Sequence, residues 1–387
     1  MIRAMPRLRQ FCGSVLLGAR LAACGGTPVE PPQAAAAAAA QVPVRHVFLL
    51  LLENEDYERS FGAASPAAYL SKQLPALGAQ LQNYYGTAHY SLGNYLALIS
   101  GQGPTPQIQA DCHSFDDFVA TATAADSQAV GQGCVYPALV RTLPDQLEAA
   151  GLSWRGYMED MGNTPQRESA TCGHPPANSA DHTQKATAAD AYASRHDPFV
   201  YFHSITDNSA RCARNVVNLR QLPDDLASAA ATPNFVFITP SLCHDGHDSP
   251  CVSGEPGGLV SADRFLQQWV PQILASPAFK QDGLLIITFD ESNGPQTDGS
   301  ACCGEGAGAN AARPGISGDG GGRVGAVLLS PFIKPGTVSA QPYNHYSTLR
   351  SIEQIFGLPY LGYAGSAGQA GFGADVYTAL PQNTAAR

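Results

Sequence analysis

Two apolar runs end abruptly in acidic and amide residues, and this change of character limits the folds open to the chain. The runs are "RHVFLLLLEN" at 45–54 and "GLLIITFDE" at 283–291. Continuous runs of Val, Ile and Leu are typical of parallel strands that are buried on both faces. Ligand sites in such sheets lie beyond the carboxyl ends of the strands. The two runs therefore predict a site at one edge of a parallel sheet.

Strand-like and helix-like segments alternate along the rest of the chain. Strands are expected at 45–52, 153–159, 234–240, 283–289 and 323–331. The spacing of apolar residues predicts helices at 66–81, 91–101, 143–151, 261–276 and 346–357. This alternation predicts an α/β fold of three layers, α/β/α, with a mostly parallel central sheet.

Composition excludes two classes of protein. A hydrophobic content of 44% excludes a disordered chain. A net charge of −10 without a basic stripe argues against a general nucleic-acid binder, because phosphate backbones are held by clustered Lys and Arg. No nucleic-acid partner is expected.

The N-terminal segment 1–24 has the make-up of an export signal, with a basic start, a short apolar stretch and small residues before Cys24. Residues 21–24 resemble the bacterial lipobox, in which the cysteine receives the lipid; a plain secretory signal cut nearby is the alternative. An Ala/Pro-rich tether is expected at 25–43 and one catalytic domain at 44–387. We expect an exported bacterial protein, anchored in the cell envelope (periplasmic or outer surface) through Cys24, or secreted.

Of the 10 cysteines in the chain, all but Cys12 and Cys24 follow the signal. An even number of cysteines in an exported chain predicts disulfides, and the absence of CxxC pairs argues against zinc ligation. The simplest local pairings are Cys112–Cys134 and Cys243–Cys251.

The acidic strand ends supply candidate metal ligands, which are Glu53, Asn54, Asp290 and Glu291. Oxygen atoms converging there repel one another unless a cation neutralises them. An all-oxygen set suits Ca²⁺, Mg²⁺ or Mn²⁺ better than Zn²⁺. Each acid alone is better explained as a solvated loop residue or a helix cap. The two acidic ends together favour a divalent metal ion.

Ser91 stands where the helix of "SLGNYLALISG" should begin. Serine is a common N-cap, and this is the alternative to a catalytic role. A helix N-terminus also offers free N–H groups to a phosphate, so Ser91 could be a nucleophile there. Asn94, one turn later, would donate a hydrogen bond to a phosphoryl oxygen.

Histidines provide the third group of candidates. The segment "TPSLCHDGHDSPC" carries His244, Asp245, His247 and Asp248 directly after an expected strand. His345 precedes the helix at 346–357. Single loop histidines are usually ordinary surface residues, but two His and two Asp in one short loop indicate a site.

Eight segments, in order from residue 44 to 360, resemble one family. They are "HVFLLLLENEDYERSFG", "HYSLGNYLALISG", "WRGYMEDM", "HDPFVYF", "ITPSLCHDGHD", "IITFDESNG", "GGGRVGAVLLSPFIKPG" and "NHYSTLRSIEQIFGLP". Together they are similar to the bacterial phosphoesterase family of acid phosphatases and phosphatidylcholine-type phospholipases C, in the alkaline phosphatase superfamily. The resemblance implies an alkaline-phosphatase-like fold.

The resemblance also implies roles for single residues. The family's two metal-binding pairs fall on Glu53-Asn54 and Asp290-Glu291, and its Ser/Thr nucleophile falls on Ser91. Gly93 stands where the family usually has proline, while Asn94 is kept. Phosphate-side and second-site positions of the family fall on His89, His244, Asp245, His247 and His345.

Those last residues have two possible roles. Asp245 and His247 could hold a second ion, or the histidines could replace that ion as a cationic clamp on phosphate, which we favour. His345 is expected to be a phosphate contact or general acid, with metal ligation and helix capping as alternatives. In "HDPFVYFHSI" only His196 and His203 are set apart from an ordinary buried segment.

The resemblance implies metal-dependent hydrolysis of phosphate esters through a serine nucleophile. We expect an acid phosphatase acting on phosphomonoesters, because the family's phospholipases C carry further C-terminal β domains and this chain ends soon after "QIFGLP". Alternatives are a phospholipase C or other phosphodiesterase acting on phospholipid, and a non-catalytic surface lipoprotein.

Overall fold

The computed structural model describes residues 42–294 and 298–379, together with Met1. Contacts group the chain from Gln41 onward as one compact unit. The expected signal, the lipobox at Cys24 and nearly all of the tether lie outside the described residues. The domain boundary at residue 44 and the lipid anchor therefore stay predictions.

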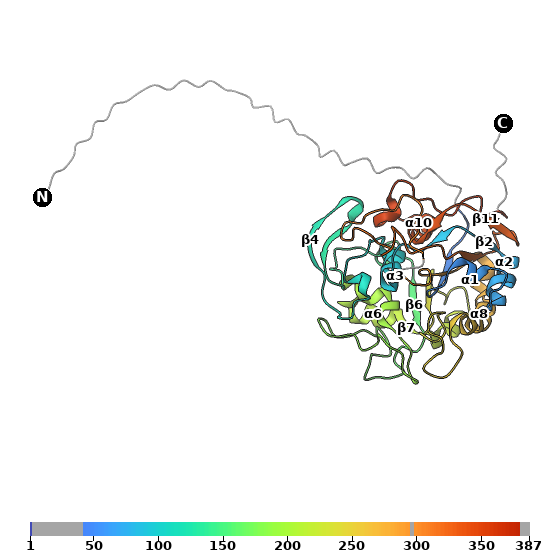
Figure 1. The fold of residues 1–387 in the computed structure, drawn as a ribbon, viewed down its shortest axis with the longest axis horizontal. Helices are drawn as coiled ribbons and strands as arrows, with labels where there is room; N and C mark the ends of the chain where they lie inside the picture. The colour runs from blue at the N-terminus through green and yellow to red at the C-terminus, as the bar shows by residue number, and fades with distance from the viewer. Residues whose placement is uncertain (2–41, 295–297, 380–387) are drawn as a thin grey trace, which may run out of the picture. The chain divides into compact units, whose positions relative to one another are not determined.

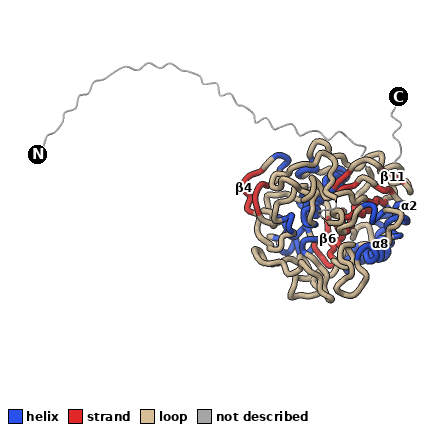
Figure 2. The backbone as a smooth tube through the Cα atoms, in the orientation of Figure 1, coloured by secondary structure: helices blue, strands red, loops and turns tan. Residues whose placement is uncertain are grey.

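A central sheet of eight strands organises the described residues (Figures 1 and 2). Across the sheet the order is β11 (Thr337–Ser339), β2 (Ala79–Leu81), β10 (Ala326–Leu329), β9 (Gly283–Phe289), β1 (His46–Leu52), β8 (Phe235–Thr239), β6 (Trp154–Met158) and β7 (Val216–Asn218). Strands β9, β1, β8, β6 and β7 are all parallel to one another. Every residue of β1 and β9 is buried, which explains their continuous apolar sequences.

Strand β10 corrects one expectation. It was grouped with the buried parallel strands, but it pairs antiparallel with both β9 and β2. The chain enters it from the same sheet edge at which β9 ends, after the long segment that follows Glu291. An apolar run shows that a strand is buried on both faces, and it carries no information about strand direction.

The segment 66–81 also differs from expectation, because it is not one helix. It forms a π-helix at Tyr69–Gln73, the short helix α2 (Leu74–Leu77) and then β2. Gly78 separates helix from strand, and a Cβ atom at this position would lie 2.1 Å from the carbonyl oxygen of Leu328 in β10. Close approach of the two backbones therefore requires glycine at the point where the helix ends.

Helices cover both faces of the sheet and complete the three layers (Figure 1). One set consists of α1 (Tyr57–Phe61), α2, α8 (Gly258–Ala275) and α9 (Pro277–Asp282). The other set consists of α3 (Ser91–Ser100), α4 (Leu143–Ala149), α6 (Ser209–Asn215) and α10 (His345–Phe356). Shorter helices are α5 (His203–Thr206) and α7 (Leu222–Asp225). The expected three-layer α/β class with a mostly parallel sheet is confirmed.

Two small sheets lie outside the central one within the described residues. Strands β4 (Val119–Thr123) and β5 (Ala129–Gln132) form an antiparallel hairpin, and every β4 residue is exposed (Figure 2). Strands β3 (Tyr84–Tyr85) and β12 (Tyr343–Asn344) pair in parallel. This short pairing brings the segments before α3 and α10 side by side.

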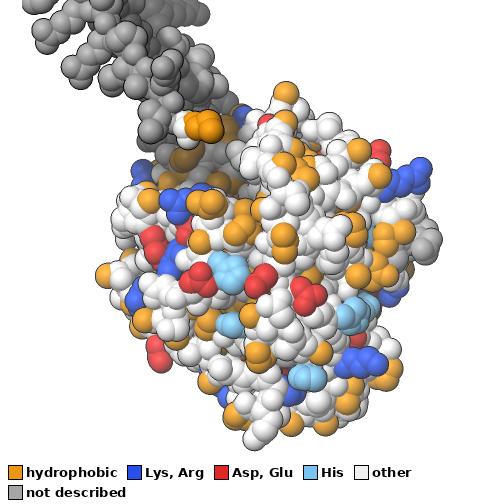
Figure 3. Space-filling view, turned by 90° about the vertical axis from the view of Figure 1, so that its left-hand side faces the viewer, with side chains coloured by type: hydrophobic (Ala, Val, Ile, Leu, Met, Phe, Trp, Pro, Cys, Tyr) orange, Lys and Arg blue, Asp and Glu red, His pale blue; other side chains and the backbone are white. Residues whose placement is uncertain are grey.

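The charged side chains on one face and the lengths of the helices can both be described. On the face in Figure 3, Lys and Arg are scattered among acidic and histidine side chains and form no stripe. Among the described residues, no helix combines the length and the apolar character needed to cross a bilayer.

The described residues contain four disulfides: Cys112–Cys134, Cys172–Cys212, Cys243–Cys251 and Cys302–Cys303. The structure has both expected local pairings, and it adds two that the sequence left open. Disulfides of this number are typical of proteins that fold in an oxidising compartment.

The disulfides should differ in their contribution to stability. Cys172–Cys212 spans 40 residues, so replacing both cysteines by alanine should cost about 4 kcal/mol by the loop-entropy relation. Cys302–Cys303 joins neighbouring residues and restricts the unfolded chain far less. Urea denaturation of the two double-alanine variants measures the difference. Equal losses of unfolding free energy would contradict the expectation.

Candidate functional site

The strand register places the two acidic strand ends level with each other. Leu52 at the end of β1 pairs with Phe289 at the end of β9, and the Asp290 N–H donates to the Leu52 carbonyl at 2.9 Å. The Asn54 N–H in turn donates to Asp290 Oδ1 at 2.9 Å, with Asn54 at φ 52°. Glu53 and Asp290, far apart in sequence, are therefore neighbours, as expected. The structure gives Asn54 a backbone role in holding Asp290.

A third carboxyl group joins them from the loop after β8. The Glu53 N–H donates to the backbone carbonyl of Asp245 at 2.8 Å, and the side chains of Glu53, Asp245 and Asp290 are all fully buried. Burial raises the pKa of Glu53 well above its usual value, and the charges of the other two acids raise it further. Burial also raises the pKa of Asp290 to about 7. We call Glu53, Asp245 and Asp290 the carboxylate cluster.

The cluster has unsatisfied oxygen atoms. Asp245 Oδ2 and Asp290 Oδ2 are buried and have no hydrogen-bond partner among the described residues. Buried carboxylates without partners are costly, and a bound cation removes that cost. The donor set consists of oxygen atoms, which fits a hard divalent ion. The residues present therefore fit a metal ion, with Glu53, Asp245 and Asp290 as its holders.

Ser91 lies against this cluster at the first turn of α3. Its hydroxyl donates to Glu53 Oε2 at 2.6 Å, and the Tyr95 hydroxyl donates to Glu53 Oε1 at 2.7 Å. The N-cap position belongs to Tyr90, and the Leu92 N–H is capped by Asp111 Oδ1 at 3.1 Å. Ser91 thus presents its hydroxyl to the acids and does not cap the helix. Asp111 occupies part of the helix N-terminus that we expected to be open to phosphate.

Asn94 has a different role from the expected phosphoryl contact. Its Oδ1 accepts from the N–H groups of Thr87 and Ala88, each at 2.9 Å, and its Nδ2 donates to the Ala88 carbonyl at 2.9 Å. The side chain is fully buried, with both ends of the amide bound to the turn before Ser91. Asn94 is therefore placed to fix the turn that presents Ser91.

His196 and Arg195 lie on another side of the cluster. His196 Nε2 is 3.4 Å from Glu53 Oε2, its Nδ1 is 3.7 Å from Asp245 Oδ2, and its ring stacks on Tyr95 with centroids 5.2 Å apart. Arg195 Nε lies 3.8 Å from Asp111 Oδ2. Burial lowers the pKa of His196 well below its usual value. Burial thus favours the neutral ring, whose Nε2 has no hydrogen-bond partner among the described residues and could bind a metal cation.

The sequence set His196 apart without giving it a role, and it missed Arg195. The clue was the polar sequence "SRHD" immediately before the buried segment 198–202. His203, set apart for the same reason, lies elsewhere, where its ring nitrogens face Asp207 at 2.8 Å and Asp117 at 3.1 Å.

Glu291 and His89 form a pair of their own. His89 Nδ1 contacts Glu291 Oε2, and His89 Nε2 faces the backbone carbonyl of Asp298 at 2.8 Å. Both side chains are buried, and burial lowers the pKa of His89. Consecutive residues of the Asp-Glu pair thus contact different partners, Asp290 in the carboxylate cluster and Glu291 at His89.

His345 reaches the site edge as expected, but by a different route. After antiparallel β10, the chain returns through β11 and β12, and His345 Nε2 faces the Asp290 carbonyl at 2.5 Å. Its Nδ1 faces the Tyr84 hydroxyl at 3.0 Å. The ring is fully buried, and burial lowers its pKa to about 4. A neutral ring with both nitrogens engaged does not suit the expected general acid, so the geometry gives His345 a positioning role.

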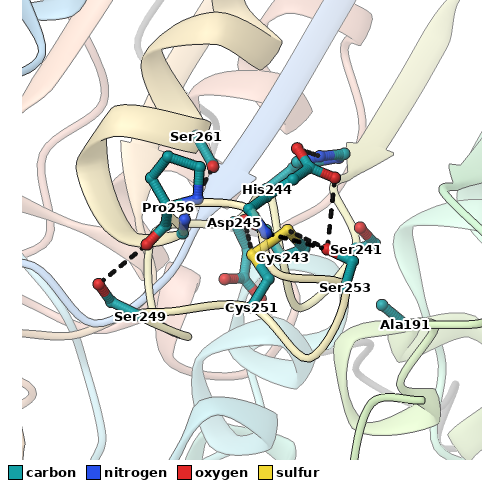
Figure 4. Close-up of a disulfide and its surroundings, with 12 residues drawn as sticks. Ala191, Ser241, Cys243, His244, Asp245, Ser249, Cys251, Ser253, Pro256 and Ser261 are labelled. Atoms are coloured by element: carbon teal, nitrogen blue, oxygen red, sulfur yellow. Dashed lines mark hydrogen bonds and ion pairs between the residues drawn. A yellow bond between two sulfur atoms is a disulfide. The ribbon is translucent and has the colours of Figure 1, made fainter. Parts of the chain in front are cut away.

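His244 points away from the cluster, contrary to expectation. The disulfide Cys243–Cys251 closes its loop (Figure 4). The His244 ring faces Glu159 Oε2 at 2.9 Å and Glu255 Oε2 at 3.4 Å. The hydrogen bond to Glu159 raises the pKa of His244 to about 9. Cys243, His244 and Glu255 lie close enough to hold a metal, but the Cys243 sulfur is already bonded to Cys251.

His247 stays nearer to the carboxylate cluster than His244. Its N–H donates to Asp245 Oδ1 at 2.9 Å, while its half-exposed ring lies 3.6 Å from Asp248 Oδ1. Burial lowers the pKa of His247, an effect that Asp248 opposes. The four histidines expected to form a phosphate clamp are therefore not gathered in one place.

Glu159→Gln should destabilise the protein in a pH-dependent way. The pKa of His244 is raised from 6.5 to about 9, so the folded state holds this proton more tightly than the unfolded chain. That contribution is fully present below pH 6.5 and is lost as the pH rises through 9. Urea denaturation at about pH 6 should show a loss that has disappeared near pH 10. The same loss at both pH values would contradict this assignment.

Comparisons with known proteins identify the family and several relatives of the chain. The sequence model of the Phosphoesterase family matches residues 66–359. A probable acid phosphatase of Kluyveromyces lactis is 27% identical over 82% of this chain and 59% of its own length. An acid phosphatase of Aspergillus fumigatus is 27% identical over 83% of this chain and 57% of its own length. The chain thus spans less than two thirds of these fungal relatives.

One further relative comes from a bacterium. A phosphatidylinositol-3-phosphatase of Mycobacterium tuberculosis is 24% identical over 87% of this chain and 85% of its own length. Among solved structures, a sulfatase from Pseudoalteromonas sp. aligns with a TM-score of 0.48 and 12% identity, over 90% of this chain and 74% of that one. The family model covers most of the described residues, and the chain belongs to the phosphoesterase family.

Proposed function

We propose that this protein hydrolyses phosphate esters with Ser91 as nucleophile and a divalent metal ion held by the carboxylate cluster. The observation that carries the proposal is the 2.6 Å hydrogen bond from the Ser91 hydroxyl to Glu53, within a group of fully buried acids. A serine hydroxyl is a weak nucleophile until a base or a metal ion activates it. The carboxylate cluster beside Ser91 can supply both the base and the metal ligands. Membership of the phosphoesterase family supports the reaction class.

The residues act in two steps. Glu53 orients the Ser91 oxygen and receives its proton at Oε2, which lies 2.6 Å from that oxygen. A bond forms between the Ser91 oxygen and phosphorus while the bond to the alcohol oxygen breaks, and the alcohol leaves after taking one proton from water. The hydroxide left by that water then attacks the phosphoserine, Glu53 returns its proton to the departing Ser91 oxygen, and phosphate is released with Glu53 and Ser91 both restored. When bound, the metal ion supplies positive charge for the phosphoryl oxygens.

Other residues support this reaction by position. Asn94 fixes the turn before Ser91, Tyr95 holds the second oxygen of Glu53, and Arg195 adds positive charge near Asp111. Ca²⁺, Mg²⁺ and Mn²⁺ are the favoured ions because the cluster offers oxygen ligands. Zn²⁺ is the second choice, with His196 as an additional nitrogen ligand.

A phosphomonoester is the favoured substrate. Relatives named acid phosphatase and phosphatidylinositol-3-phosphatase support it. A phospholipase C or other phosphodiesterase is the second candidate, supported by the family membership alone. The two candidates are distinguished by comparing the rates at which the protein hydrolyses phenyl phosphate, a monoester, and diphenyl phosphate, a diester. The protein is first treated with a chelator, and single metal ions are then added back. Faster hydrolysis of the diester would replace the first candidate by the second.

Ser91→Ala should abolish turnover and leave the fold intact. The Ser91 hydroxyl does not cap α3, so its loss removes only the hydrogen bond to buried Glu53, worth about 1–3 kcal/mol. Ser209→Ala is the matched control, because Ser209 likewise opens a helix, α6, but is exposed. Turnover and thermal unfolding of both variants test this. More than a few per cent of residual activity in Ser91→Ala would exclude Ser91 as the nucleophile.

Glu53→Gln and Asp290→Asn should each weaken metal binding. Either change removes one charge from the carboxylate cluster and lowers its attraction for a cation. In the chelated state both variants should unfold at a higher temperature than wild type, because removing one acid reduces the repulsion among the buried carboxyl groups. Calorimetric titration with Ca²⁺, Mg²⁺ and Mn²⁺ measures affinity, with exposed Asp224→Asn as control. Unchanged affinity in both cluster variants would remove the metal from this proposal.

A further inference from the structure

A cavity lies beside the site and has no part in the reaction described so far. Its volume is about 340 Å³, and we call it the Glu305 pocket. Thr87, Cys303, Glu305, Tyr346, Tyr363 and Gln369 are among its lining residues. The reaction uses none of these side chains.

Two walls of the Glu305 pocket belong to segments that carry site residues. Thr87 is held by Asn94 in the turn that leads to Ser91, and Tyr346 directly follows His345. Pro314 also lines the pocket, and its carbonyl accepts from the His89 N–H at 3.1 Å. The pocket is thus adjacent to the turn that presents the nucleophile.

Glu305 is the unusual group in this pocket. Its Oε1 accepts a hydrogen bond from Asn344 Nδ2, while its Oε2 is buried and has no hydrogen-bond partner among the described residues. Burial raises the pKa of Glu305 well above its usual value, Asn344 opposes this, and the charge of Asp319 adds to it. A buried carboxyl oxygen without a partner is costly to the fold, so a donor that fills the pocket would repay that cost.

The remaining lining residues favour a positively charged donor. None of the described residues that line the pocket is Lys or Arg, whereas Asp126 is a second acid among them. Tyr346 and Tyr363 meet edge to face, with ring centroids 5.4 Å apart. Aromatic rings attract cations through their electron-rich faces. Two acids and two tyrosines without a basic residue disfavour a phosphate in this pocket and suit an ammonium group.

The segment that carries Glu305 is held in place. Cys302–Cys303 lies immediately before it, and the Glu305 N–H donates to the Cys302 carbonyl at 3.0 Å. Gln369 Nε2 donates to the Cys303 carbonyl at 3.4 Å from the other side of the pocket. The carboxyl group is therefore positioned before any ligand arrives, which lowers the entropic cost of binding.

We propose that the Glu305 pocket binds a primary ammonium group carried by the alcohol half of the phosphate ester. This inference rests on the proposed function, because it assigns the part of the substrate that leaves when Ser91 is phosphorylated. A primary ammonium offers N–H donors to Glu305 Oε2 and a charge to the tyrosine faces. A quaternary ammonium has no N–H to donate, and a neutral hydroxyl brings no charge, so both should bind more weakly.

The test compares alkyl monoesters that differ only in this group. Phosphoethanolamine carries the ammonium, propyl phosphate lacks it, phosphocholine makes it quaternary and glycerol phosphate replaces it with hydroxyls. Glu305→Gln keeps the shape and removes the charge. It should raise KM for phosphoethanolamine by about tenfold or more, the usual worth of a charge-assisted hydrogen bond. KM for propyl phosphate and kcat for both esters should stay within about twofold of wild type.

Two further variants separate this effect from a general loss of structure. Ala307→Trp enlarges an exposed residue of the pocket wall, so it should reproduce the KM effect without touching Glu305. Asp224→Asn removes an exposed acid remote from the lining residues and should change nothing. Equal KM changes for phosphoethanolamine and propyl phosphate, or a larger effect on glycerol phosphate or phosphocholine, would overturn the proposal.

Direct binding keeps the pocket testable apart from turnover. Free ethanolamine should bind wild-type and Ser91→Ala protein equally in calorimetric titration, and binding should be lost in Glu305→Gln and Ala307→Trp. If no phosphate ester is hydrolysed but ethanolamine binds in this pattern, the proposed function fails and the ammonium site stands. If esters are hydrolysed but ethanolamine binds no variant differently from wild type, the site fails and the proposed function stands.

Discussion

The level ends of β1 and β9 are the constraint on which the site depends. Because Leu52 pairs with Phe289, the residues that follow both strands leave the sheet at the same height. Glu53 and Asp290 are therefore forced together, and Asp245 joins them from the loop after β8. The charges of Asp245 and Asp290 raise the pKa of buried Glu53, and a proton or a cation relieves the repulsion among the three acids. The repulsion does not push the acids apart, because they follow strands β1 and β9, which are buried along their whole length.

A second layer of interactions fixes the nucleophile relative to these acids. Asn94 ties the turn before α3, and Asp111 caps the helix, so the hydroxyl of Ser91 is left for Glu53. His345 contacts the backbone carbonyl of Asp290 and so helps to hold this acid in place. Several residues that resembled direct participants thus act through position. Their side chains are buried and fully bonded, which suits support of the site better than contact with substrate.

Local sequence predicted the elements well where one rule dominated. The buried strands and the helices that carry Ser91 and His345 are confirmed, because their apolar patterns are long and regular. The helix predicted for 66–81 was wrong in its second half. There Gly78 lies against β10, and the residues after it form strand β2 although their apolar spacing is helical. The expectation that β10 runs parallel to its neighbours was also wrong. Burial on both faces gives the same apolar run in parallel and antiparallel strands, so sequence pattern carries no signal for it.

The sequence by itself determined the fold class, the acidic strand ends and the family, because buried strands, their polar ends and ordered motifs are written in local residue order. Tertiary structure alone decided which histidines belong to the site. His196 lies in the site near Glu53, whereas His244 lies outside it near Glu159. The orientation of a loop side chain depends on such neighbours, which are distant in sequence. Tertiary structure also decided that Glu305 Oε2 is buried without a hydrogen-bond partner among the described residues. The residues that line its pocket come from several segments of the chain, so no single segment predicts this.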